Sequence, residues 1–403
     1  MRIPNRLAVI ATHPIQYHAP VYRMLQRQFD VPVTVIYASD FSVAGYHDSE
    51  FGTTFSWDAD LLSGYTPVFL SRVAEGGART LESVSVRGLW RVLQDIAPQV
   101  VLMVGYGLRF HQFAFAQVLR LGRPILFRGE TTDHAQRRGV VKAWGRDHAL
   151  RWFYQRCARL LYVGQQSYQH FTRLQCPPEK LLFSPYCVDC RPFRSDEVAR
   201  SQDRLSLRRR LGIEDSQYCF IFSGKLSLRK GPHLLLQAFR HLSISLREQC
   251  VVVFVGNGAE RESLKQLAED TPALRVHFVG FQTQQQLSPY YHAADLLVLP
   301  SLTAETWGLV VNEALHHGLP CVVSEAVGCA PDLIERGKTG ELCRTGTSAD
   351  LAGAIQRALV FKDRLEVREQ CRQQVSHYTV EHAAAGIARA YWSVVEHKRQ
   401  SKV

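Results

Sequence analysis

Short apolar runs recur along the chain, each followed by a polar loop and then by a segment of helical length. Runs of this kind, rich in valine, isoleucine and leucine, are typical of strands buried on both faces of a parallel sheet. The alternation of strand and helix predicts an α/β fold of doubly wound parallel sheets with helices on both faces. The expected strands cover residues 7–11, 31–37, 100–104, 124–128, 159–163, 218–223, 250–255, 276–279, 296–299 and 321–324, and the clearest helices cover 21–28, 86–96 and 110–121.

The alternation is interrupted near residues 184–203, where Pro185, Pro192 and a polar run intervene. A length of 403 residues favours two domains of roughly 200 residues each. We therefore expect an N-terminal domain over residues 1–186, a C-terminal domain over 187–375 and a final helical segment over 376–403.

The composition is that of an ordinary globular protein, with 46% hydrophobic and 21% charged residues. No run is long and apolar enough to span a bilayer, and the run over residues 7–11 is too short for a signal-peptide core. The ten cysteines are scattered and form no zinc-binding pattern, so most read as small buried hydrophobes. We expect a cytoplasmic protein without a structural metal.

The formal net charge of +11 is concentrated in the segment Arg137–Arg159. A basic segment with interleaved aromatic residues could lie on an anionic membrane surface, each basic side chain adding about 1 kcal/mol. It could equally be a solvated helix face whose aromatic rings belong to the core. No recognisable nucleic-acid-binding module accompanies the charge, so we expect no nucleic-acid partner. The basic residues are Arg137, Arg138, Lys142, Arg146, Arg151, Arg156 and Arg159, the acid is Asp147, and the aromatic residues are Trp144, Trp152, Phe153 and Tyr154.

The stretch from Leu296 to Pro331 carries the strongest chemical signal. After the strand over 296–299 and a short polar loop, Thr306 is placed to cap a helix that runs to about His317. The unpaired N–H groups in the first turn of a helix bind anions, and Gly308 lets a ligand approach them closely. The sequence therefore predicts an anion site at the start of this helix.

Two carboxylates and two lysines define the chemistry expected there. Glu305 lies in the loop, whereas Glu313 lies inside the helix. Loops at the carboxyl ends of parallel strands face one crevice, so Lys225 and Lys230 should converge on the same anion. A carboxylate beside a phosphate site suits the hydroxyl groups of a sugar, because like charges repel. We therefore predict a site for a nucleotide diphosphate that carries a polyhydroxylated group.

The loop after the first strand contains His13 and His18, which could face an acceptor or a phosphate, although a lone histidine is more often structural. No GxGxxG motif follows a first strand, which argues against a nicotinamide or flavin site. No Gx4GK[ST] motif is present either, which excludes a P-loop enzyme.

Taken together, the motifs over residues 184–345 resemble those of the retaining glycosyltransferases of family 4, which have the GT-B fold. A single motif would be weak, but the whole series occurs in the order and at the spacing of the family. The series is Cys187-Val188-Asp189, Gly224-Lys225-Leu226, Lys230-Gly231, Val255-Gly256-Asn257-Gly258, Val279-Gly280-Phe281, Ala294-Asp295, Pro300-Ser301, Glu305 with Glu313, Gly318-Leu319-Pro320, Gly328-Cys329-Ala330-Pro331-Asp332 and Gly337-Lys338-Thr339-Gly340.

The resemblance implies that the C-terminal domain binds a UDP- or GDP-sugar and that the sugar is transferred with retention to a glycan or lipid-linked acceptor, without a metal. It implies that the lysines neutralise the diphosphate, that Glu305 faces the transferred sugar and that Glu313 binds the ribose. It also implies that helices over 380–397 pack back on the N-terminal domain. The residues assigned to the nucleotide-sugar are Gly224, Lys225, Lys230, Asn257, Gly280, Phe281, Thr306, Trp307, Gly308, Leu309 and Glu313.

The N-terminal domain departs from the family pattern. The first loop lacks the usual paired glycines, and the position of a histidine near the sugar is held by Glu130, with His134 four residues on. We rank Glu130 first as the substitute, and group it with Glu305, Lys225 and Lys230 as candidate catalytic residues. His13, His18, Glu130 and His134 are the candidates for the acceptor or sugar side. The alternatives are a nucleotide-sugar-binding protein without turnover, and an epimerase or phosphorylase on the same fold.

Overall fold

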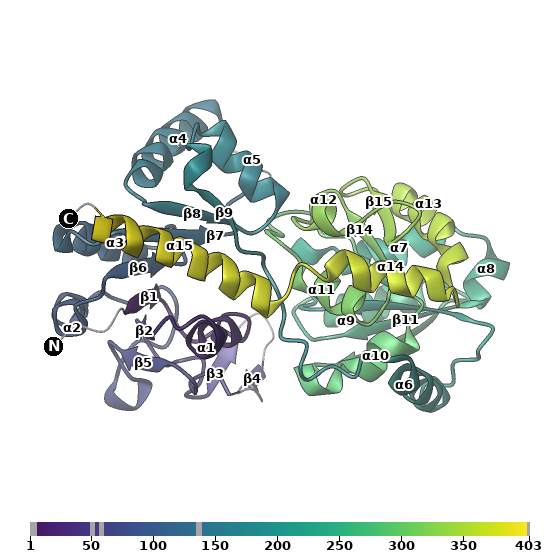
Figure 1. Cartoon of the computed structure of the whole chain (residues 1–403). Helices are drawn as coiled ribbons and strands as arrows, with labels where there is room; N and C mark the ends of the chain where they lie inside the picture. The colour runs from purple at the N-terminus through teal and green to yellow at the C-terminus, as the bar shows by residue number, and fades with distance from the viewer. Residues whose placement is uncertain (1–5, 49–52, 56–59, 134–138, 401–403) are drawn as a thin grey trace.

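The computed structural model describes residues 6–48, 53–55, 60–133 and 139–400. Two parallel sheets, each covered by helices on both faces, lie side by side (Figure 1). The N-terminal sheet has seven strands in the order β5-β2-β1-β6-β7-β8-β9, and the C-terminal sheet has six in the order β12-β11-β10-β13-β14-β15. These are the two Rossmann-like domains of a GT-B fold, as the alternation and the resemblance predicted.

The apolar runs mark the central strands accurately, because those strands are buried on both faces. Five of the expected strands have the predicted bounds in the structure, and the others differ by one or two residues at one or both ends. The strands that follow apolar runs are β1 (Leu7–Ala11), β2 (Val33–Tyr37), β6 (Val100–Met103), β7 (Ile125–Gly129), β8 (Arg159–Tyr162), β10 (Tyr218–Ser223), β11 (Cys250–Val255), β12 (Arg275–Gly280), β13 (Leu296–Leu299) and β14 (Cys321–Ser324).

Edge strands and one hairpin were not expected. They are β5 (Thr66–Phe69), β9 (Leu181–Phe183), β15 (Gly340–Cys343) and the antiparallel pair β3 (Tyr46–Asp48) and β4 (Thr53–Phe55). β5 and β9 are only partly buried, and none of the five carries a long apolar run. Short edge strands carry little periodic signal, so hydrophobic pattern does not reveal them.

Helices fill the segments between the strands. Three begin at other residues than expected: α1 begins at Ala19 rather than Val21, α2 at Leu89 rather than Val86 and α3 at Arg109 rather than Phe110. The helices are α1 (Ala19–Gln28), α2 (Leu89–Ile96), α3 (Arg109–Leu121), α4 (Val140–Gln155), α5 (Gln165–Arg173), α6 (Glu197–Arg210), α7 (Pro232–Arg240), α8 (Ile244–Glu248), α9 (Arg261–Glu269), α10 (Ser288–Ala293), α11 (Leu309–His316), α12 (Ala330–Leu333), α13 (Ser348–Ala358), α14 (Leu365–Val375) and α15 (Val380–Gln400).

The helix α15 crosses from the C-terminal half of the molecule and runs along the N-terminal domain, as expected (Figure 1). Its buried side chains, among them Ile387 and Tyr391, belong to one apolar cluster with Leu7 and Val9 of β1. The approach is close: a Cβ on Gly386 would lie 2.1 Å from the Phe183 carbonyl oxygen. The final helical segment thus packs on the N-terminal domain, and the division at residues 186/187 and 375/376 stays a prediction.

The cysteines and the longer helices agree with an ordinary globular interior. All ten cysteines are free thiols, and nine of them are buried. Within the described residues, no helix combines the length and apolarity needed to cross a membrane.

Candidate functional site

A cavity of about 450 Å³ lies between the two domains, at the carboxyl ends of their strands. Open α/β sheets bind ligands at this edge, because the strand-to-helix loops gather there. Ile15, Gln16, Tyr17 and Glu130 line the cavity from the N-terminal domain, and Tyr186 lines it from the segment that connects the domains. The residues that line it from the C-terminal domain are Ser223, Gly224, Lys225, Arg229, Lys230, Val255, Gly256, Phe281, Gln282, Thr283, Gln284, Leu287, Glu305, Thr306, Trp307, Gly308, Leu309, Val310 and Glu313.

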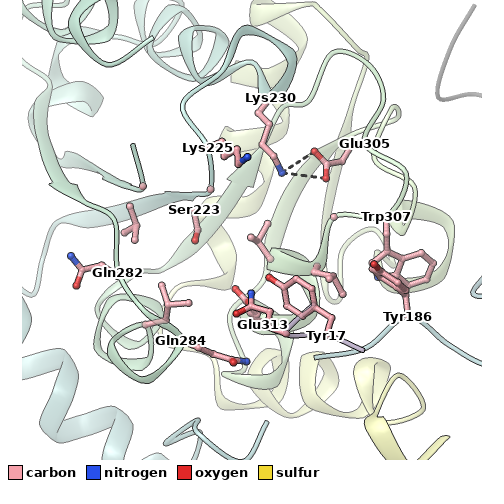
Figure 2. Close-up of a pocket in the computed structure, with 18 of the residues that line it drawn as sticks. Tyr17, Tyr186, Ser223, Lys225, Lys230, Gln282, Gln284, Glu305, Trp307 and Glu313 are labelled. Atoms are coloured by element: carbon pink, nitrogen blue, oxygen red, sulfur yellow. Dashed lines mark hydrogen bonds and ion pairs between the residues drawn. The ribbon is translucent and has the colours of Figure 1, made fainter. Parts of the chain in front are cut away.

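Glu305 and Lys230 form an ion pair in this cavity (Figure 2). Lys230 Nζ lies 3.0 Å from Glu305 Oε2 and 3.2 Å from Oε1. Arg229 Nη1 lies 3.4 Å from the same Oε2, and Ser301 donates its hydroxyl hydrogen to it at 3.2 Å. The Glu305 carboxylate is only 8% exposed. Two cations and a hydroxyl therefore compensate the burial of this charge.

The loop after β10 brings the second lysine to the same place. Gly224 opens the loop at φ 133°, a conformation that favours glycine, and Lys225 lies beside Lys230 in Figure 2. Both lysines line the cavity, and their binding of a common anion stays a prediction.

The helix α11 begins at Leu309, with Gly308 as its N-cap at φ 99°. The prediction that Thr306 caps this helix is wrong. The Thr306 hydroxyl instead donates to Glu130 Oε2 at 2.6 Å, across the boundary between the domains. A left-handed residue at the cap explains why glycine is needed there, and a Cβ at Gly308 would lie 2.9 Å from Val327 Cγ1. Gly308, Leu309 and Val310 still line the cavity, so the helix start faces it as expected.

Glu313 lies one turn into α11 and is 3% exposed. Its Oε2 accepts a hydrogen bond of 2.6 Å from the Tyr291 hydroxyl. Burial raises the pKa of Glu313 to about 7, although the Tyr291 hydrogen bond and the charge of Lys230 both act to lower it. This carboxyl group therefore changes its charge near neutral pH, at a place where it faces the cavity.

The N-terminal side of the cavity is less charged. Glu130 directly follows β7, and Tyr17 and Tyr186 add aromatic rings (Figure 2). Neither His13 nor His18 lines the cavity. His13 packs against Phe41 and accepts or donates a 2.9 Å hydrogen bond with Thr12, and burial lowers its pKa to about 4.

His18 lies between aromatic rings, with centroid distances of 6.1 Å to both Tyr22 and Tyr186. Burial, helped by the charge of Arg128, lowers its pKa to about 3. Of the other candidates, Asn257 and Gly280 lie next to lining residues rather than among them, and His134 lies outside the described residues.

Trp307 joins the two domains. Its indole is 3% exposed, and Nε1 donates to Asn312 Oδ1 at 2.8 Å. A Cβ on Gly164, at the start of α5, would lie 2.4 Å from the Trp307 ring, so only glycine permits this approach. Asp332 completes the junction by accepting a 2.9 Å hydrogen bond from the Gln165 backbone N–H.

Sequence reasoning did not select Arg229, Ser301, Tyr17 or Tyr186 for the site. Arg229 carried a usable signal, because it lies in the same basic loop as Lys230. The two tyrosines carried none, since their place at the cavity depends on how the N-terminal domain and the connection meet the C-terminal domain.

The C-terminal half of the chain is similar in sequence to known glycosyltransferases. Residues 203–377 match a family model described as Glycosyl transferases group 1. A D-inositol 3-phosphate glycosyltransferase of Nocardioides sp. is 34% identical over 207 residues, which cover 46% of this chain and 44% of that protein. A lipopolysaccharide 1,2-N-acetylglucosaminetransferase of Salmonella typhimurium is 30% identical over 198 residues, which cover 47% of this chain and 51% of that protein. The matched region thus spans about half the length of these curated relatives.

Solved structures match over nearly the whole chain. Anabaena Alr3699/HepE in complex with UDP superposes with a TM-score of 0.71 at 18% identity, covering 96% of this chain and all of the other. WaaG, a glycosyltransferase involved in lipopolysaccharide biosynthesis, gives a TM-score of 0.66 at 17% identity, covering 95% of this chain and 98% of its own. Residues 203–377 are therefore similar to the glycosyl transferases group 1, in a chain that has the GT-B fold.

Proposed function

We propose that this protein is a glycosyltransferase of the hexosyltransferase type, which moves a sugar from a UDP- or GDP-sugar to a glycan or lipid-linked acceptor with retention of configuration. The observation that carries the proposal is the meeting of Lys230, Glu305 and the start of α11 in one interdomain cavity. The relatives named as glycosyltransferases and the neighbours solved with UDP and with UDP-glucose support it.

The diphosphate binds where positive charge and backbone N–H groups converge. Lys225, Lys230 and the N–H groups at Gly308 and Leu309 are its partners, together with the backbone near Trp307. Charge-assisted contacts of this kind contribute about 1.5–3 kcal/mol each when partly buried. Arg229 has a supporting role, because it keeps Glu305 paired when Lys230 turns towards the phosphate.

The nucleoside lies on the other side of the helix start. Glu313 accepts hydrogen bonds from the ribose hydroxyls, and Phe281 lies by the base. Gly224, Asn257 and Gly280 shape the loops that hold them, and Thr306 holds the sugar end.

Transfer proceeds by attack on the face from which the diphosphate departs. The acceptor oxygen forms the new bond to the anomeric carbon as the bond to the phosphate oxygen breaks, and the acceptor proton passes to the leaving phosphate. Glu305 stabilises the positive charge that develops on the sugar. The lysines and the helix N-terminus stabilise the departing diphosphate, so we propose that no metal takes part.

Turnover by the purified protein tests this function. A panel of uridine, guanosine and adenosine diphosphate sugars is assayed for donor hydrolysis and for transfer, with Glu305→Gln and Lys230→Ala alongside. Unchanged turnover in both variants contradicts the mechanism. Nucleotide binding without turnover of any donor favours a binding protein, whereas turnover without acceptor or dependence on inorganic phosphate favours an epimerase or a phosphorylase.

The helix α4 supplies a second element of the proposal, contact with an anionic membrane surface. All four aromatic residues of this basic segment could belong either to the core or to an exposed face. In the structure Phe153 and Tyr154 are buried, whereas Trp144 is 66% and Trp152 48% exposed. Val141, at the start of the same helix face, is also exposed. The apolar stripe on α4 thus faces outwards.

The basic charge beside that stripe is smaller than the sequence suggests. Arg146 is paired with Asp133 at 3.4 Å, while Lys142 and Arg156 are exposed. Arg137 and Arg138 lie outside the described residues. We propose that α4 rests on the inner face of a membrane through its tryptophans, with Lys142 and Arg156 near the lipid phosphates.

Sedimentation with vesicles tests this contact. The protein should sediment with anionic phosphatidylglycerol vesicles at low salt but not with phosphatidylcholine vesicles, and the double variant Trp144→Ser/Trp152→Ser should stay in the supernatant. An absence of binding at low salt contradicts the proposal.

A further inference from the structure

Glu130 closes the cavity from the N-terminal domain. Its Oε2 accepts the 2.6 Å hydrogen bond from the Thr306 hydroxyl, and Tyr186 lines the same cavity. Thr306 directly follows Glu305 in the chain, so Glu130 is held against the loop that carries Glu305. Both carboxylates line the same cavity. Glu130 therefore lies at the end of the cavity where the proposed function places the transferred sugar.

The two carboxylates differ in how their charge is compensated. Glu305 is paired with Lys230 at 3.0 Å and Arg229 at 3.4 Å. The hydrogen-bond partner of Glu130 is the Thr306 hydroxyl, and in the described part of the chain no basic side chain forms an ion pair with Glu130. A hydroxyl group orients a carboxylate but does not cancel its charge. Glu130 thus adds one negative charge at the sugar end of the cavity, beyond the charge of Glu305 that Lys230 and Arg229 compensate.

We propose that Glu130 determines donor specificity: it admits sugars that are neutral or carry an ammonium group, and it rejects sugars that carry a carboxylate. The inference rests on the proposed function and names the substrate class of the same site. A sugar hydroxyl or ammonium group donates to the Glu130 carboxylate, whereas a sugar carboxylate meets a like charge. Two like charges about 7 Å apart in a partly buried site repel enough to lower affinity about tenfold or more.

A pair of donors that differ only at C6 tests the proposal. UDP-glucose carries a hydroxymethyl group there and UDP-glucuronic acid a carboxylate; GDP-mannose and GDP-mannuronic acid form the same pair for guanosine. The dissociation constants of both members are measured by calorimetry, and their ratio cancels any change common to the two ligands. UDP and GDP alone report whether the nucleotide site is intact.

The wild-type protein should bind the acidic donor about tenfold or more weakly than its neutral partner. Glu130→Gln, which keeps the shape and the hydrogen-bond acceptor, should bring the ratio close to one, and Glu130→Asp, which keeps the charge, should preserve it. Glu325→Gln removes a carboxylate just beyond β14, outside the cavity lining, and should leave the ratio as it is.

Two results overturn the inference alone: equal binding of both donors by the wild-type protein, or an unchanged ratio in Glu130→Gln. Failure of the protein to bind UDP, GDP and all four donors overturns the proposed function, and the inference with it.

Discussion

The two sides of the cavity are built on different principles. The C-terminal side uses charge: Arg229 and Lys230 pair with Glu305, and Lys225 and the start of α11 line the same cavity. The N-terminal side uses shape and hydroxyl groups, with Tyr17 and Tyr186 around the single carboxylate of Glu130. The charged side can hold a diphosphate whatever sugar it carries, so the strength of binding should reside there. Under the proposed function, selection among sugars and acceptors falls to the other side.

The largest effect should come from Lys230. In Lys230→Ala the diphosphate loses its main counter-charge, and we expect kcat/KM for donor turnover to fall about a hundredfold or more. Lys265→Ala is the matched control, because Lys265 also pairs with a glutamate, at 2.8 Å, but on the surface helix α9. A fall of less than about tenfold in Lys230→Ala would remove the contrast between the two sides.

Glu313 should reveal a cost in stability on the charged side. Its pKa is raised from 4.5 to about 7 by burial, so the folded protein binds this proton more tightly than the unfolded chain. The carboxyl group is therefore stabilising only at low pH, and its contribution is lost as the pH rises through about 7. At about pH 8, Glu313→Gln should raise the free energy of unfolding by about 1–3 kcal/mol, measured by urea denaturation. If the wild-type protein and Glu313→Gln had equal free energies of unfolding both well below and above about pH 7, the prediction that a buried Glu313 carboxylate destabilises the fold would be wrong.

The same group should impose a pH dependence on nucleotide binding. Above about pH 7 the Glu313 carboxylate accepts ribose hydroxyl hydrogens, and below it the protonated group accepts them poorly. We expect UDP or GDP affinity to fall about tenfold between about pH 8 and about pH 6. The phosphate of the ligand also titrates near pH 6, so Glu313→Gln serves as the reference. If the difference in nucleotide affinity between the wild-type protein and Glu313→Gln did not vary with pH, a contact between Glu313 and the ribose would be excluded.

The smallest effect should come from His13. It lies outside the cavity lining, with its ring against Phe41. His13→Gln should change kcat/KM and the ratio between donors by less than about twofold. A larger loss would return this histidine to the acceptor side, where the sequence placed it, and would show that the N-terminal side contributes more than selectivity.

Sequence reasoning was accurate where local pattern determines structure. The strands β10, β11, β13 and β14 are continuous apolar runs buried on both faces, and their bounds were predicted without error. The C-terminal side of the cavity was predictable for the same reason, because each lining loop follows directly from such a strand.

The errors arose where a distant contact decides. Thr306 has the right residue type for a helix cap, yet its hydroxyl is taken by Glu130, which lies 176 positions away in the chain. The same contact places Glu130 against the loop that carries Glu305, while His134 lies outside the described residues. The edge strands β5 and β9 escaped prediction because half-exposed strands need no apolar run.

The helix α15 has a consequence for how the protein folds. Residues of α15 such as Ile387 and Val395 belong to the same apolar cluster as Leu7 and Val9. The N-terminal domain therefore cannot complete its core until residues near 395 have been synthesised, after the whole C-terminal domain. Contacts of such sequence separation slow folding, because a long loop must close before they form. The nascent N-terminal domain thus carries an uncovered apolar face while the C-terminal domain is being made.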